Sequence, residues 1–573
     1  MVEFAFRIAA VYAALSYALL GLGLTGLCRP SEALGAVLIA ALAFLWIAVK
    51  AFRRGPLRTH LPTFLLATLL LLIYSHALFI PPFARDDMIY HLQVPKLMAM
   101  TGRLAFDPFN ANSNFPLLFE MPFAALDVLR TPLSPFVINV GFALLLVLVF
   151  HAALAARTSL TAGQRMAASV AFAATPVLFD LLHTGYAEIF FALLILLAAL
   201  YYLDHLDIGA RGAWVKACAC LGLACAVKYP GVIFAGVFIA SEFFRARDRK
   251  RLYRGAALCA ASASPWYLKS WILTGNPVFP LANSIFASPY ISAMRFQGFH
   301  HMLADYNMGR APLDYLLLPF RLAMGIDEGG PGRGAGFDGR MSLLFAVALA
   351  GMGWKDAGRR FITLLAAGYF AVWAVESQQT RFLLAILPIA AVYGLRRAEA
   401  LPRRSAWIYL GAAVIIAQSA WNIAGKMRSD RILPLLAGTL DRDAFLSAQM
   451  PLSYGLSGDI NGRLDPKRDK LMTVGTFGRN YYFDIPTLSN TFYEQEVFRN
   501  AFERGNAHPD SLSAFLDANG VTYILFAWDY VLKMHAPDKG FDKEALEAYF
   551  ARTCKTVVEG GHDVLYQRIA PGG

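Results

Sequence analysis

Charged residues are scarce in this chain of 573 residues. Only 16% of its residues are Asp, Glu, Lys or Arg, whereas 57% are hydrophobic. Because a typical soluble protein has about 25% charged residues, the composition excludes an ordinary soluble globular protein. The sequence therefore predicts a polytopic membrane protein.

Cysteine is also scarce, which excludes a fold held together by disulfide bonds. The six cysteines lack the paired Cys-x-x-Cys spacing of a zinc site, and five of them lie inside or near apolar runs: Cys28, Cys218, Cys220, Cys225 and Cys259, with Cys554 alone near the C-terminus. Small thiols in apolar helices usually pack against their neighbours. We therefore expect these side chains to be packing residues.

A nucleotide-binding loop is also missing from the sequence. The glycine-rich stretch at residues 329–336 lacks the strand before it and the helix after it that a phosphate-binding fingerprint requires. Its composition is typical of an outer loop. We also find no internal repeat and no low-complexity segment.

Long apolar runs dominate the chain as far as Ala424. Counting stretches of roughly 15–25 apolar residues predicts about thirteen transmembrane helices. The first run, at residues 4–27, is not expected to be a signal peptide. Glu3 and Arg7 make a poor basic segment, and another apolar run follows almost at once.

The net charge of +12 arises from basic residues that cluster in alternate loops. These loops lie at residues 50–58, 157–165, 211–216, 245–254, 355–360 and 396–404. By the positive-inside rule they are cytoplasmic, so the excess charge reports orientation and does not indicate nucleic-acid binding. We expect a multi-pass protein of the cell (inner) membrane with a cytoplasmic N-terminus.

The remaining loops are acidic, aromatic or rich in Gly and Pro, and this topology places all of them on the outer face. They lie at residues 81–135, 183–188, 228–231, 274–340 and 376–381. Every segment with a chemically interesting motif is among them.

Beyond Lys426 the composition becomes that of a soluble domain. Short apolar runs at 471–474, 521–526 and 564–566 predict strands, and residues 511–516 predict a helix that ends at Asn519-Gly520. We therefore predict a transmembrane domain at 1–426, with outer loops at 81–135 and 274–340, and an extracytoplasmic α/β domain at 427–573.

Two adjacent carboxylates, Asp86 and Asp87, follow the apolar run at residues 63–81. A charge at the centre of a bilayer costs roughly 2.5–3.5 kcal/mol or more, so this pair is expected at the membrane boundary or in a wet cavity. A helix over residues 88–100, stopped by Gly102, would bring Asp86 near Tyr90 and Asp87 near His91. The alternative is that one aspartate only caps the helix.

Several motifs together resemble the GT-C glycosyltransferases, which take a sugar from a polyprenyl phosphate at the outer face of a membrane. The first loop resembles the signature of bacterial members similar to the aminoarabinose and protein mannosyl transferases. In chain order the motifs are Asp86-Asp-Met-Ile-Tyr-His-Leu92 with Pro95-Lys96, Phe115-Pro116 with Phe119-Glu-Met-Pro122, Thr184-Gly-Tyr-Ala-Glu188, Lys228-Tyr-Pro-Gly231, Gly275-Asn-Pro-Val-Phe-Pro280 and Arg381-Phe-Leu-Leu-Ala-Ile-Leu-Pro388. The resemblance covers about residues 60–425.

The resemblance implies a catalytic role for the acidic pair. It makes Asp86 the base that deprotonates the acceptor, with Asp87 in support. Arg381 and Lys228 are then candidates to stabilise the leaving lipid phosphate. The other candidate substrate-binding residues are Tyr90, His91, Lys96, Glu188 and Asn276.

Simpler interpretations stay open for several of these residues. Lys228 or Arg381 could be a flank that anchors its helix among the lipid headgroups. Glu188, where members of the family often have Asp, could be a second carboxylate, a metal ligand with Asp86, or a residue at a helix N-terminus. No cofactor is certain, and a divalent cation is left open. Three further histidines are expected to be ordinary loop residues: His183, His300 and His301.

The sequence thus predicts an inverting glycosyltransferase that moves a sugar from a polyprenyl-phosphate donor to a hydroxyl of a lipid, glycan or protein acceptor. One rival is a transporter or flippase of lipid-linked substrates, which should have charges near the bilayer midplane and repeat symmetry. The other rival is a non-catalytic assembly subunit. Neither the sugar nor the acceptor can be read from the motifs.

Overall fold

The fold is described from a computed structural model. It describes residues 1–53, 57–104, 106–107, 109–210, 212–245, 249–291, 293–325, 340–451, 453–488, 497–498, 501–502, 507–534, 542–561 and 563–569. The glycine-rich stretch at 329–336 lies outside these residues.

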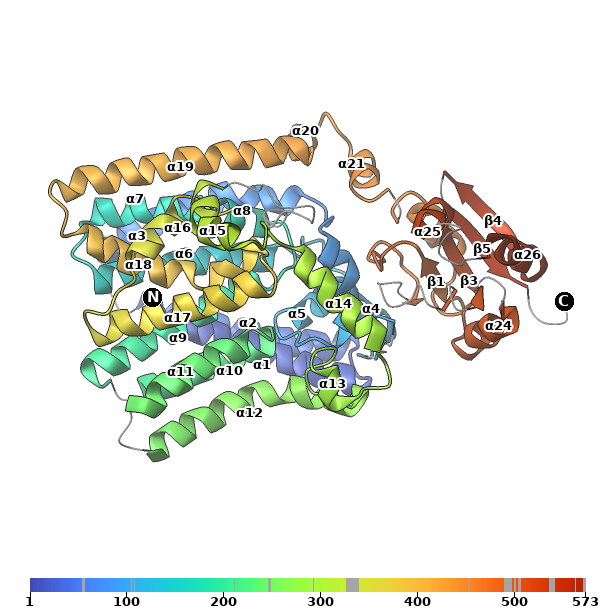
Figure 1. Ribbon diagram of the computed structural model, residues 1–573, viewed down its shortest axis with the longest axis horizontal. Helices are drawn as coiled ribbons and strands as arrows, with labels where there is room; N and C mark the ends of the chain where they lie inside the picture. Colours follow the sequence, from blue (N-terminus) through green and yellow to red (C-terminus); the bar gives the residue numbers. More distant parts are fainter. Residues whose placement is uncertain are drawn as a thin grey trace.

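A bundle of helices makes up the larger part of the molecule (Figure 1). Its helices are α1 (Val2–Thr25), α2 (Pro30–Phe52), α3 (Leu57–Tyr74), α6 (Val137–Arg157), α7 (Ala162–Ala173), α9 (Glu188–Ile208), α10 (Ala213–Val227), α11 (Gly231–Arg245), α12 (Arg249–Thr274), α16 (Leu344–Ala350), α17 (Ala357–Val375), α18 (Leu387–Ala398) and α19 (Arg404–Ser429).

Six of the described helices are long and apolar enough to cross a membrane, which confirms the polytopic class. The predicted number of about thirteen spans is not confirmed by this criterion and stays a prediction. These helices differ in how much of their apolar part is buried inside the protein. The apolar part of α9 is 89% buried, whereas that of α2 is 17% buried. α9 is therefore a central helix, and its first residue is Glu188.

Short elements connect the helices. They are η1 (Ser75–Phe79), η2 (Asp87–His91), α4 (Gln93–Thr101), η3 (Ala111–Asn114), α5 (Met121–Val128), α8 (Pro176–Leu181), α13 (Asn283–Phe286), α14 (Ala293–Asp305), α15 (Pro312–Met324) and η5 (Thr380–Ala385). Of these, α4, α13 and α14 lie at the end of the bundle nearest the C-terminal domain (Figure 1).

The first loop is not the single α-helix that its spacing predicted. Residues 87–91 form one π turn, in which the N–H of Leu92 donates to the carbonyl of Asp87 at 3.1 Å. Pro95 explains the difference, because it has no N–H to donate to the carbonyl of His91 in a continuous α-helix. The predicted end is confirmed, since α4 stops at Gly102 in a left-handed conformation.

The C-terminal domain is built on a five-stranded sheet with the order β2-β1-β3-β5-β4. Its strands are β1 (Leu471–Val474), β2 (Thr487–Leu488), β3 (Tyr523–Ala527), β4 (Cys554–Gly560) and β5 (Asp563–Arg568). β2, β1 and β3 are parallel, whereas β5 is antiparallel to β3 and β4. The three predicted strands are therefore confirmed.

The described helices that follow α19 are α20 (Ile432–Leu436), α21 (Arg442–Gln449), α22 (Ser457–Arg463), α24 (Pro509–Ala518), α25 (Trp528–Met534) and α26 (Lys543–Thr553). The predicted helix at 511–516 falls inside α24, which is followed by Gly520 with a positive φ of 63°. Ile432, Phe445 and Met450 belong to the hydrophobic core of the bundle, whereas the sheet has separate cores. The segment after α19 therefore packs with the membrane domain.

The loop after β1 docks the C-terminal domain onto the first loop. The N–H of Asn480 donates to the carbonyl of Met88 at 3.1 Å, and the Tyr482 hydroxyl donates to the carbonyl of Pro82 at 2.7 Å. These contacts flank the Asp86-Asp87 pair. The carboxyl end of β1 is thereby held against the segment that carries the predicted catalytic residues.

Candidate active site

A cavity of about 230 Å³ opens among the loops of the bundle. Its polar wall comes from the first loop, the segment after α10, and η5. Its apolar wall comes largely from α14 and from rings on neighbouring loops. The residues that line it include Arg85, Asp86, Tyr90, His91, Phe115, Glu120, Lys228, Tyr229, Phe299, Met302, Tyr306, Arg381, Phe382 and Phe477.

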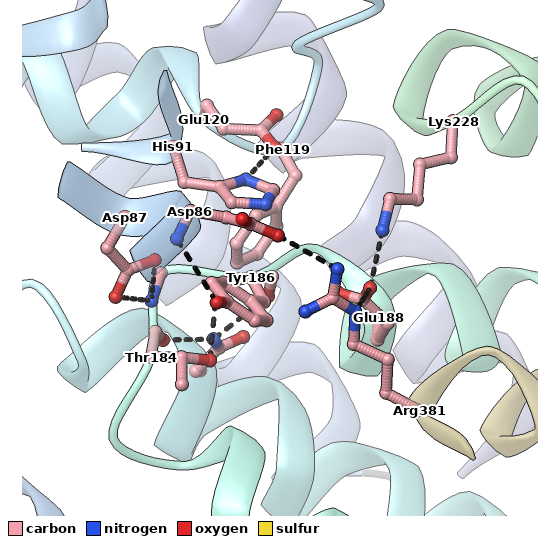
Figure 2. A network of polar contacts seen from close by, with 12 residues as sticks. Asp86, Asp87, His91, Phe119, Glu120, Thr184, Tyr186, Glu188, Lys228 and Arg381 are labelled. Atoms are coloured by element: carbon pink, nitrogen blue, oxygen red, sulfur yellow. Dashed lines mark hydrogen bonds and ion pairs between the residues drawn. The ribbon is translucent and has the colours of Figure 1, made fainter. Parts of the chain in front are cut away.

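The Arg381 guanidinium lies at the centre of an ion-pair network at this cavity (Figure 2). It donates to the Asp86 carboxylate at 2.8 Å, and its Nε lies 3.0 Å from Oε1 of Glu188. The Lys228 ammonium also donates to Oε1 of Glu188. Two cations and two carboxylates are thus brought together from four segments of the chain.

Aromatic rings support these cations. The Arg381 guanidinium lies 4.5 Å from the ring centre of Tyr186, and the Lys228 ammonium lies 4.7 Å from that of Phe382. Such cation–π contacts are stronger where water is excluded, and only 5% of the Arg381 side chain is exposed. The position of the guanidinium is therefore fixed by packing as well as by charge.

Asp86 faces the cavity as an ionised group. Burial alone would raise the pKa of its carboxyl, but the positive charges of Arg381, Arg85 and Lys228 hold it below its ordinary value. The backbone N–H of Asp86 donates to the Tyr186 hydroxyl at 3.2 Å. Although Asp86 occupies the N-cap position of the π turn, its side chain makes no capping hydrogen bond.

Asp87 points away from Asp86, toward the loop before α9 (Figure 2). It is fully buried, and both of its carboxyl oxygens accept the N–H of Gly185, at 2.9 and 2.8 Å. Burial raises the pKa of Asp87 well above its ordinary value. It does not line the cavity, so its geometry suits positioning of the first loop better than proton transfer.

Gly185 is required where this contact forms. A Cβ placed there would lie 2.9 Å from Cδ2 of Leu92 and 3.0 Å from Oδ1 of Asp87. Asn139 on α6 braces the same loop, since its amide donates to the carbonyls of Thr184 and Tyr186 at 2.5 and 3.0 Å. The acidic pair therefore rests on a rigid support.

Glu120 is a site residue that was not among the sequence candidates. Its carboxyl oxygen lies 2.6 Å from Nδ1 of His91, and both side chains are buried. Burial raises the pKa of Glu120 well above its ordinary value and lowers that of His91 well below its ordinary value. At neutral pH we therefore expect a protonated carboxyl beside an uncharged imidazole.

The segment that carries Glu120 is held by α1. The hydroxyl of Tyr12 donates to the carbonyl of Phe119 at 2.6 Å, and the hydroxyl of Ser16 donates to that of Leu118. An isolated acid in the apolar segment 115–125 was the available signal for this residue. Arg85, Tyr186 and Phe477 were also missed, because each acquires its role from a distant segment.

The structure brings most predicted site residues together. Asp86, Tyr90, His91, Lys228 and Arg381 line the cavity, and Glu188 contacts both cations behind its wall.

Lys96 and Asn276, the other two predicted substrate-binding residues, do not line this cavity. Lys96 reaches the C-terminal domain, where its ammonium donates to the carbonyl of Tyr481 at 2.6 Å and to Asp484 at 2.7 Å. Asn276 folds onto its own loop, since its amide donates to the carbonyl of Leu281 at 2.7 Å and its Oδ1 accepts the N–H of Val278. These contacts hold both side chains away from the cavity that Asp86 and Arg381 line.

The described residues do not fit the divalent cation that the resemblance left open. They contain no group of three or more His, Cys, Asp or Glu side chains arranged to hold a metal ion. Asp86 and Glu188, the two candidate ligands, are both neutralised by Arg381, whose guanidinium lies between them.

The three further histidines lie elsewhere. His183 is buried with its ring stacked on Phe83 at 6.0 Å, and His300 and His301 are exposed on α14. None of the three lines the described cavity.

No protein-family model and no curated protein matches the chain. Among solved structures, ArnT from Cupriavidus metallidurans bound to undecaprenyl phosphate matches with a TM-score of 0.53 and 14% identity, covering 88% of this chain and 98% of that one. Its apo state matches with a TM-score of 0.53, 14% identity and coverage of 88% and 97%. The archaeal oligosaccharyltransferase AglB from Archaeoglobus fulgidus matches with a TM-score of 0.48, 13% identity and coverage of 89% and 74%.

The likeness to ArnT extends over most of both chains. It shows that this chain shares the fold of ArnT. The predicted class, a helical membrane protein with a small C-terminal sheet domain, is confirmed by the six apolar helices and the five-stranded sheet of the described residues.

Proposed function

We propose that this chain is a glycosyltransferase that moves a sugar from a polyprenyl-phosphate donor to an acceptor hydroxyl at the outer face of the membrane. One observation carries the proposal: the ionised Asp86 carboxylate lies beside the Arg381 and Lys228 cations on the wall of one cavity. The fold it shares with ArnT, which was solved with undecaprenyl phosphate, supports a donor of this class.

The two cations are suited to hold the donor phosphate. Arg381 presents a planar fork that matches phosphate oxygens, and Lys228 adds a mobile point charge. Both cations line the cavity, although Arg381 also contacts Asp86 and Lys228 also contacts Glu188. A phosphate that enters would share these cations, so positive charge is already fixed where negative charge develops as the lipid phosphate leaves.

Asp86 is suited to act as the base. As the acceptor oxygen attacks the anomeric carbon, its proton passes to the Asp86 carboxylate while the bond from that carbon to the phosphate oxygen breaks. The phosphate leaves with the bonding electron pair, and the configuration of the sugar is inverted. A bound phosphate partly compensates the positive charge of Arg381. The Asp86 carboxylate is then less stabilised, so its proton affinity rises when the donor is in place.

A transporter is the rival that the site must be weighed against. Transporters place charged groups at a binding site near the bilayer midplane, between repeats. Here the charged residues come from loops between helices, and Phe477 of the C-terminal domain lines the same cavity. Their placement favours chemistry at one face of the membrane.

The test uses the full-length protein in nanodiscs with a panel of labelled polyprenyl-phosphate sugars and native membranes as the source of acceptor. We expect transfer of one sugar, and loss of transfer by about 10²–10⁴-fold in Asp86→Asn, the usual contribution of a general base. Asp305→Asn, an exposed acid at the end of α14, is the matched control. Full activity of Asp86→Asn would refute the base assignment. Movement of intact donor across the bilayer without bond cleavage would favour the transporter.

A further inference from the structure

A second cavity, of about 580 Å³, lies between the first loop and the C-terminal domain. It is formed by α5, α21, α22 and the segment at 481–484. Its lining is polar and aromatic, and includes Lys96, Asp127, Arg442, Asp443, Tyr454 and Tyr481. Ligand sites occur preferentially at such boundaries between domains, and the volume lies in their usual range.

The charged side chains of this cleft differ in whether they already form hydrogen bonds or ion pairs within the protein. Lys96 is held by two backbone carbonyls and by Asp484, and Asp443 accepts the hydroxyl of Tyr454 at 2.6 Å. Asp127 on α5 is different, because no hydrogen bond or ion pair joins its carboxyl to any of the described residues. Burial raises the pKa of Asp127 to about 6.

These groups exclude some ligands and favour another. The lining has three carboxylates and two cations, and this excess of negative charge disfavours an anionic ligand. Among the described residues no three His, Cys, Asp or Glu side chains are arranged to hold a metal ion. The Tyr454 and Tyr482 rings meet edge to face with centroids 5.0 Å apart, and Tyr481 packs on Tyr482 at 5.3 Å. A ligand with many hydroxyls and apolar C–H faces suits an open carboxylate beside aromatic rings.

We propose that this cleft binds an uncharged oligosaccharide, and that this saccharide is part of the acceptor. The binding claim stands on the cleft alone, whereas its assignment to the acceptor rests on the proposed function. One chain segment links the two cavities, since Phe477 lines the first and Tyr481 lines the second. Four residues of chain span at most about 14 Å, so the two cavities lie close together.

The binding test is saturation-transfer NMR on the full chain in nanodiscs, because maltoside detergents are themselves saccharides. The probes are maltotriose, mannotriose and triacetylchitotriose. We expect at least one to bind, and Asp127→Ala to weaken its binding by about tenfold or more, since hydrogen bonds to charged groups are the strong ones. Asp127→Asn, which keeps the side-chain shape, should weaken it in the same direction. Asp510→Ala, an exposed acid in the first turn of α24, is the matched control.

Each result decides the proposal. Binding that falls in both Asp127 variants and persists in Asp510→Ala and Asp86→Asn places the saccharide in the cleft. Binding that is unchanged in the Asp127 variants, that is lost in Asp86→Asn, or that is absent for all three probes overturns it. Failure of the proposed function has a different signature, which is the absence of donor turnover by the wild-type protein.

Discussion

The Arg381 guanidinium and the Asp86 carboxylate form a 2.8 Å ion pair that joins two segments far apart in the sequence. The same guanidinium lies 3.0 Å from Glu188. A single arginine therefore neutralises the proposed base and a carboxylate behind it, and stays available at the cavity for a phosphate. This shared contact makes Arg381 the residue on which both stability and chemistry depend.

Two replacements of Arg381 should distinguish the contribution of its charge from that of its planar side-chain geometry. Arg381→Ala leaves two carboxylates without their cation, so we expect it to destabilise the protein by about 3–5 kcal/mol and to abolish transfer. Arg381→Lys keeps the charge but cannot present a fork, so it should fold and should raise the KM for the donor. Thermal unfolding in nanodiscs and donor titrations measure the two effects. An unchanged donor KM in Arg381→Lys would place the phosphate elsewhere.

Sequence patterns predicted the parts of this site that depend on local order. Asp86, Tyr90 and His91 lie close together because one short segment carries them, and Gly102 ends α4 because a left-handed cap favours glycine. Hydropathy likewise predicted the helical class, and alternating apolar residues predicted three strands of the C-terminal sheet.

The contacts that could not be predicted are those made between distant segments. The residues around Lys96 in the sequence do not show that its ammonium binds the loop after β1. Those around Asp87 do not show that Gly185 lies beside its carboxylate. Glu120 was missed for the same reason, since its partner lies in another segment. Tertiary packing decides which polar residue of a motif faces the cavity.

Asp87 is predicted to act as a positioning residue. Asp87→Ala leaves the buried N–H of Gly185 without its partner, so we expect a loss of about 1–3 kcal/mol in stability. Gly185→Ala removes no charge but pushes against Leu92 and Asp87, so it should also lower the rate of transfer. Both variants should change the rate more than the KM for the donor. If Asp87→Ala kept wild-type stability while losing all activity, a direct chemical role would be favoured.

The neutral state of the His91–Glu120 pair gives a matched test. Glu120→Gln preserves a neutral hydrogen-bonding side chain, so we expect stability close to that of the wild type. Glu120→Ala leaves Nδ1 of His91 buried and unpaired, which should cost about 1–3 kcal/mol. Thermal unfolding at neutral pH compares the two variants. Equal destabilisation by Gln and Ala would mean that the pair is charged.

The predicted orientation can be tested by labelling, because all six native cysteines are buried. Ser511→Cys lies at an exposed position of α24, and Lys355→Cys lies at an exposed position between α16 and α17. With the C-terminal domain outside, a membrane-impermeant maleimide should label Ser511→Cys in intact cells and Lys355→Cys only after lysis. The reverse pattern would place the cavity on the cytoplasmic side.

The pH dependence of donor turnover should report the charges around Asp86. Their net effect holds the pKa of this carboxyl below its ordinary value of about 3.9, so kcat/KM should fall only at a still lower pH if Asp86 is the base. Lys228→Met removes one of the cations that lower this pKa, so the acidic limb should move to higher pH while donor affinity falls. Lys216→Met is the matched control, because Lys216 pairs with Glu3. A limb that stays in place in Lys228→Met would show that another group sets the proton affinity of the base.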